Sequence, residues 1–134
     1  MMTASRNTFH TLLAALATTG ALVLPAPAVA HAEHGQPQYG GVVAEAGVFQ
    51  GELTAGPRGL TVYLTQHGEP LPTVGASAKL TVLSGGQRNE VTLVPAGRNQ
   101  LVAPGHGPVA TGTKVVATIR LADGRSGALR FEVR

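Results

Sequence analysis

Beyond residue 40 the chain alternates apolar and polar residues with a period of two, and Gly or Pro interrupts the pattern at short intervals. Near the end of the chain, for example, Leu129, Phe131 and Val133 alternate with charged residues. A period of two places successive side chains on opposite faces of a β-strand. No stretch in this region has the helical spacing of apolar residues, so the pattern predicts strands throughout.

The alternation predicts seven or eight short strands. They cover residues 41–47, 48–55, 60–66, 77–84, 87–95, 100–103, 113–122 and 126–134. Turn signals such as GPRG, GG and DG separate them. Such spacing is typical of all-β domains. We therefore expect an antiparallel, immunoglobulin-like β-sandwich, with a small β-barrel as the alternative, because period-two spacing does not separate the two.

The N-terminal residues have the pattern of a secretory signal. Residues 11–24 form an apolar stretch of about fourteen residues, too short to span a bilayer comfortably. The following PAPAVA places Ala28 and Ala30 at the −3 and −1 positions of a signal-peptidase site. We predict a signal peptide over residues 1–30, with cleavage after Ala28 or Ala32 and an uncleaved anchor as alternatives.

Cleavage after Ala30 divides the rest into a flexible, histidine-containing leader, residues 31–38, and a β-domain, residues 39–134. This part keeps nine of the ten basic residues and all seven acids, a net charge of about +2. The basic residues are spread singly, without a basic run or an aromatic platform, so nucleic-acid binding is not expected. There is no cysteine, so stability must come from burial, and thiolate chemistry is excluded.

The acidic residues lie mostly at predicted strand-exterior or turn positions, which indicates solubilising charges. They are Glu33, Glu45, Glu52, Glu69, Glu90, Asp123 and Glu132. No G-x-S-x-G, H-E-x-x-H or phosphate-binding loop is present. The sequence therefore predicts that the protein is not an enzyme.

The leader carries the best candidate metal ligands, His31, Glu33 and His34. If His31 is the new N-terminus, its α-amino group and imidazole can chelate one ion, and the other two side chains are close enough to contribute. Cleavage after Ala28 would make His31 the third residue, an arrangement that binds Cu(II) or Ni(II) in a square plane. The alternative is that these histidines have no role.

Further candidates lie in predicted loops. His67 and Glu69 are two residues apart at a strand end, so they can project to one side and form half a site. His106 lies between Gly and Pro residues on a bent loop. Imidazole and carboxylate suit Cu(II), Zn(II) or Ni(II). Two tyrosines, Tyr39 and Tyr63, are expected to pack at strand edges rather than to bind metal.

Four segments of the domain recur in a known pattern: GGVV (40–43), the QHGEP turn (66–70), GASAKLTVLSGG (75–86) and LVPAG (93–97). Through them, roughly residues 37–134 resemble a family of small exported bacterial proteins that accompany heavy-metal efflux systems. A similar module resembles the N-terminal domain of some periplasmic adaptor subunits of resistance-nodulation-division metal pumps.

The resemblance implies a periplasmic β-sandwich connected with metal resistance, with efflux components as partners. Of the histidines, only His67 lies on a shared motif. The family pattern has histidine where this chain has Tyr39, and the helical hairpin of a full adaptor is absent. Our hypothesis is a periplasmic accessory of metal efflux that weakly binds or buffers divalent ions. The alternative is an interaction module that docks on an envelope or pump partner without binding metal.

Overall fold

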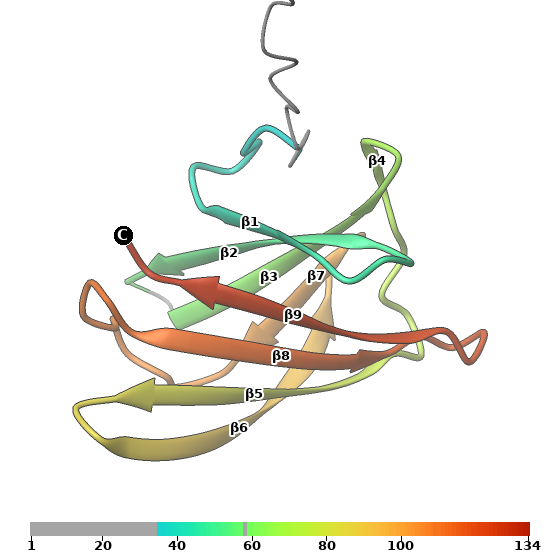
Figure 1. The fold of residues 1–134 in the computed structure, drawn as a ribbon. Coiled ribbons are helices and arrows are strands. Elements are labelled where there is room, and N and C mark those ends of the chain that lie inside the picture. The colour runs from blue at the N-terminus through green and yellow to red at the C-terminus, as the bar shows by residue number, and fades with distance from the viewer. Residues whose placement is uncertain (1–34, 58) are drawn as a thin grey trace, which may run out of the picture. The chain divides into compact units, whose positions relative to one another are not determined.

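The structure is a computed structural model that describes residues 35–57 and 59–134. The predicted signal peptide, its cleavage site and the leader residues His31, Glu33 and His34 lie outside the described residues. The described chain consists of antiparallel strands joined by turns and loops (Figure 1). They are β1 Val42–Glu45, β2 Gln50–Gly56, β3 Gly59–Gln66, β4 Glu69–Pro70, β5 Ser77–Ser84, β6 Gln87–Ala96, β7 Gln100–Ala103, β8 Lys114–Arg120 and β9 Ser126–Glu132.

The all-β prediction is confirmed. Residues 77–84 and 100–103 form β5 and β7 with the predicted bounds. The other predicted strands differ by one or two residues at one or both ends. The two-residue strand β4 was not predicted, since it lies in a proline-rich connection where it pairs with the end of β3. In the described residues no helix is long and apolar enough to cross a membrane.

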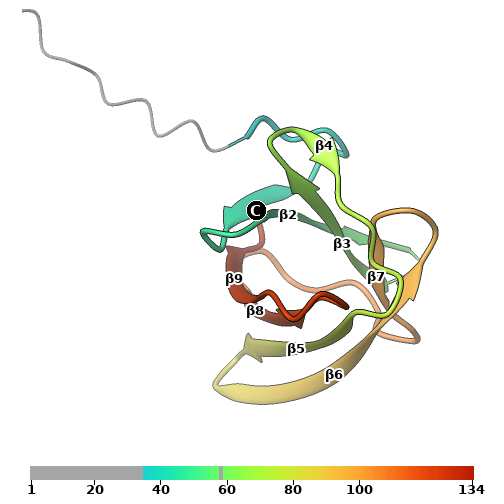
Figure 2. The ribbon, with the colours of Figure 1, turned by 90° about the vertical axis from the view of Figure 1, so that its right-hand side faces the viewer.

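The strands form one continuous sheet in the order β1-β2-β3-β7-β6-β5-β8-β9. The long strand β6 joins its two halves, because residues 87–93 pair with β5 whereas Val94–Ala96 pair with β7. The sheet curves so that β9 lies beside β1, although no backbone ladder joins these two strands among the described residues (Figures 1 and 2). This barrel-like arrangement is the alternative that the sequence left open.

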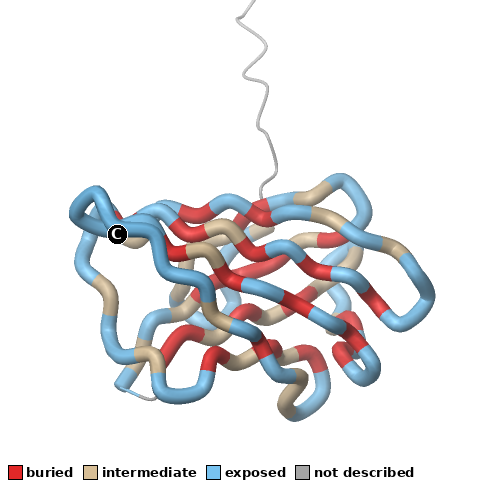
Figure 3. Tube along the Cα trace, turned by 90° about the horizontal axis from the view of Figure 1, so that it is seen from below, coloured by how far each residue is buried: buried red, intermediate tan, exposed pale blue. Residues whose placement is uncertain are grey.

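The core fills the space inside the curved sheet, and buried and exposed positions alternate along the strands (Figure 3). Its fully buried larger side chains are Leu60, Val62, Leu64, Leu80, Leu101, Val115, Ile119 and Leu129. These are the inward positions that period two predicts. Buried polar groups are satisfied: the Asn99 side-chain amide donates to the carbonyl oxygen of Leu64 at 3.0 Å, and the Thr73 hydroxyl to that of Gln100 at 2.9 Å.

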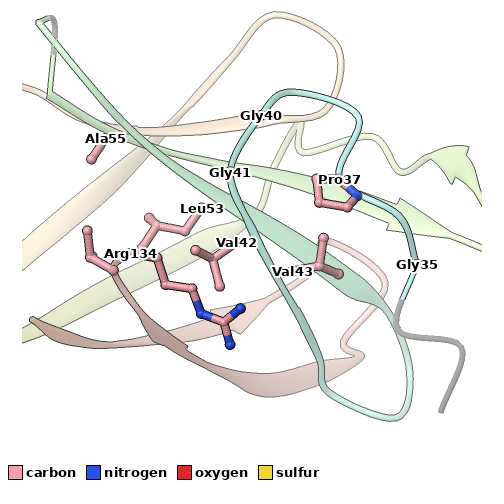
Figure 4. Close-up of a pocket in the computed structure, with 10 residues that line it drawn as sticks. Gly35, Pro37, Gly40, Gly41, Val42, Val43, Leu53, Ala55 and Arg134 are labelled. Carbon is pink, nitrogen blue, oxygen red and sulfur yellow. The ribbon is translucent and has the colours of Figure 1, made fainter. Parts of the chain in front are cut away.

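The open seam between β1 and β9 is narrow at one end and wide at the other. At the narrow end, a Cβ added to Gly127 would lie 2.8 Å from the Ala46 Cβ, so only glycine allows this approach. At the wide end a hollow of about 450 Å³ opens between the start of β1 and the end of the chain. Figure 4 shows Val42 pointing toward Leu53 and Arg134, on the opposite side of β1 from Val43.

Candidate functional site

Residues 35–41, which we call the N-terminal segment, fold back over the outer face of β1, β2 and β3. The side chain of Glu52 holds them there. Its carboxylate accepts hydrogen bonds from the backbone N–H groups of Gln38 at 2.7 Å, Tyr39 at 2.9 and 3.1 Å, and Gly41 at 2.6 Å. The ring of Tyr39 also stacks on that of Tyr63, with centroids 3.7 Å apart and planes 8° from parallel.

The prediction that Glu52 is a solubilising charge is wrong. Period two placed its side chain on the outer face of β2, where it does lie, directly opposite Val43 and Tyr63. The N-terminal segment covers this face, so Glu52 is only 5% exposed. A buried carboxylate must be stabilised by hydrogen bonds or countercharge, and here backbone N–H groups provide the hydrogen bonds.

The packed region also begins earlier than residue 39, the predicted start of the domain. Gln38 already donates to Glu52, and Gly35 lies against the side chain of Gln50, where an added Cβ would be 2.8 Å from the Gln50 Oε1. Residues 35–38 were predicted as part of the flexible leader. Within the described residues they belong to the surface of the domain.

A small hollow lies at the corner where the β1–β2 turn meets the β3–β4 turn. We call it the corner hollow. It measures about 130 Å³ and is lined by Glu45, Gln50, Gln66, His67 and the β1–β2 turn, residues 47–49. The Gln50 Nε2 donates to the Glu45 Oε1 at 2.6 Å, and the Gln66 Nε2 donates to the carbonyl oxygen of Val48 at 3.2 Å. The second bond connects the two turns directly.

The predicted site residues are thus divided among different places. His67 is exposed in the two-residue β3–β4 turn and lines the corner hollow. Glu69, exposed on β4 opposite Gln66, is not among the residues that line it. Glu45, which the sequence indicated only as a surface charge, lines the corner hollow instead of Glu69. The β1–β2 hairpin brings it to the same corner as His67.

His106 lies far from this corner. Its carbonyl oxygen packs against Gly59, the first residue of β3, whereas His67 follows the last residue of that strand. At about 3.3 Å per residue the two are separated by roughly 23 Å, so they do not share one metal ion. The His106 Nδ1 lies 3.3 Å from the Gly107 carbonyl oxygen. Among the described residues no group of three or more His, Cys, Asp or Glu side chains gathers.

The larger hollow at the seam offers less chemistry. Its lining is mostly apolar or glycine, and Arg134 is the one charged side chain that lines it within the described residues. The corner hollow, with one imidazole and one carboxylate, is the better candidate site. Comparisons of the chain with protein-family models, with curated proteins and with solved structures found no match.

Proposed function

We propose that the protein is an exported, periplasmic accessory of heavy-metal efflux that binds or buffers divalent metal ions through its leader, with His67 as a further ligand. The metal is Cu(II), Zn(II) or Ni(II), which imidazole and carboxylate donors suit. The efflux connection rests on the sequence resemblance, and the metal ligands rest on the leader composition and on the corner hollow.

The observation that carries the proposal is the position of Gly35. It packs against Gln50, and Gln50 is hydrogen-bonded to Glu45 at the rim of the corner hollow. His34 directly precedes Gly35 in the sequence, so the leader is covalently joined to the residue that packs against Gln50.

The test uses the protein recovered after export, with its N-terminus determined by mass spectrometry. Cu(II), Zn(II) and Ni(II) are titrated by calorimetry against the wild type and against a variant with His31→Ala and His34→Ala. His106→Ala is the matched control, since His106 lies far from the corner hollow. We expect stoichiometric binding by the wild type, weakened about tenfold or more in the leader variant and unchanged in the control. Absence of binding by the wild type would refute the proposal.

A second candidate function is a docking module without metal. The observation that favours it is the open seam, because β1 and β9 have no strand partner on their facing edges among the described residues. Unpaired strand edges can accept an added strand from another protein. Site-specific photo-crosslinking from position 43, compared with position 92 on the far strand β6, tests this function. Crosslinks confined to position 43 would support it, and equal yields would refute it.

A further inference from the structure

The corner hollow brings together two metal-ligating side chains that are 22 positions apart in sequence. Glu45 ends β1 and His67 follows β3, yet both line the same space of about 130 Å³. Glu45, Gln50 and Thr65 occupy one row across β1, β2 and β3, with Gln50 between the two outer strands. The sheet register therefore brings Glu45 to the end of β3 that leads into His67.

The backbone places His67 in a tight turn beside the corner hollow. His67 is the one residue other than glycine with positive φ, at 51°, in the described chain, and Gly68 follows at 81°. Two central residues with positive φ are characteristic of a type I′ hairpin turn. Histidine, like asparagine and aspartate, is enriched in this conformation, so the turn accommodates the imidazole at the corner.

Glu45 is held in place for ligation. The Gln50 amide donates to one of its oxygens, Oε1, which leaves Oε2 available to a cation. Hydrogen bonds from a neighbouring group commonly orient ligating carboxylates in this way. The bond from Gln66 to Val48 ties the turn that carries His67 to the turn beside Glu45. Both donors thus lie on a corner whose two hairpins are connected.

We propose that Glu45 and His67 form the folded half of a divalent metal site at the corner hollow, and that Glu69 is not part of it. The inference rests on the proposed function and deepens it by naming a ligand that sequence spacing did not indicate. One nitrogen and one oxygen donor suit Zn(II), Ni(II) or Cu(II). Water or other donors complete the coordination.

The test compares Glu45→Gln with Glu69→Gln, which make the same chemical change at two exposed positions near His67. His67→Asn is the third variant, because asparagine removes the imidazole while retaining a turn residue that tolerates positive φ. All three are made in the His31→Ala, His34→Ala background, so that ligands of the leader do not obscure the corner. Cu(II) is the probe, and its paramagnetic broadening of backbone amide signals is measured by NMR alongside Zn(II) calorimetry.

We expect Cu(II) to broaden the amide signals of residues 45–50 and 66–68 first. Glu45→Gln and His67→Asn should each lower the affinity about tenfold or more, whereas Glu69→Gln should leave it unchanged. Equal losses in Glu45→Gln and Glu69→Gln, or no loss in Glu45→Gln, would overturn the inference. The wild type could bind metal through its leader while the corner variants keep the same metal affinity as the His31→Ala, His34→Ala protein. In that case only this inference fails. If the wild type binds no metal, the proposed function fails with it.

Discussion

The Oε1 atom of Glu52 lies 2.6 Å from the backbone nitrogen of Gly41, on the outer face of β2. This bond and those to Gln38 and Tyr39 make Glu52 the residue that attaches the N-terminal segment to the sheet. Gly35, the first residue of that segment, lies against the side chain of Gln50.

Replacing Glu52 should therefore loosen the N-terminal segment. In Glu52→Gln, the amide NH₂ replaces one acceptor oxygen and faces backbone N–H donors, which leaves at least one partly buried donor without its partner. We expect a loss of about 1 kcal/mol in the free energy of unfolding. Amide hydrogen exchange at residues 38, 39 and 41 should accelerate. Glu132→Gln on exposed β9 is the control, and equal protection in both variants would contradict this role.

The stacked pair Tyr39 and Tyr63 should contribute measurably to the same attachment. A double-mutant cycle with Tyr39→Leu and Tyr63→Leu removes the aromatic contact and keeps apolar side chains in place. Stacked aromatic pairs contribute about 0.5–1.5 kcal/mol beyond their buried area, and we expect the low end because Tyr39 is 40% exposed. Denaturant unfolding of the four proteins of the cycle gives the coupling free energy between the two rings. A value of zero would show that the ring contact adds nothing to the free energy of unfolding.

His67→Asn should stabilise the folded protein while weakening metal binding. Asn-Gly is the preferred sequence of a type I′ turn, so we expect a small gain in the free energy of unfolding. Thermal unfolding without metal measures it. A variant that lost stability would show instead that the imidazole makes structural contacts at the corner.

Gly51→Ala tests the packing across the barrel. A Cβ at this position would collide with the Leu129 Cδ1 of the facing strand β9, and overpacking of this kind costs about 1–3 kcal/mol. Gly56→Ala, near the end of the same strand, is a matched control because nothing lies within 4 Å of its added Cβ. Similar unfolding free energies for the two variants would argue against the close approach of β2 and β9.

The pH dependence of Glu90 follows from its ion pairs. A hydrogen bond from Arg88 at 2.8 Å, supported by Lys79 at 3.4 Å, lowers the pKa of this exposed carboxyl from its ordinary value of 4.5. Because the pKa of Glu90 is lower in the folded state than in the unfolded state, its ionised carboxylate stabilises the fold when the pH is above the unfolded-state pKa. This contribution is lost as the pH falls through the folded-state pKa. An NMR titration should show the Glu90 pKa rising in Arg88→Gln, and an unchanged value would refute the pairing.

The alternation of side chains by itself determined the strands and the core. Leu60, Val62 and Leu64 alternate with polar residues, so burying one face of the strand removes these apolar side chains from water and leaves the polar ones exposed to solvent or to covering segments. Glycine pairs and DG marked turns because they tolerate positive φ. These signals are local, so they could be read without knowing the partner of any strand.

Tertiary structure alone decided the closure of the sheet and the chemistry of its surface. Period two put Glu52 on the outer face of β2 correctly, but burial of that face depends on a segment that folds back from eleven or more positions earlier. Likewise, spacing of two suggested Glu69 as the companion of His67, whereas the sheet register brings Glu45 to the corner hollow. Sequence periodicity describes neighbours along one strand, and these relationships are set by pairing and coverage between segments distant along the chain.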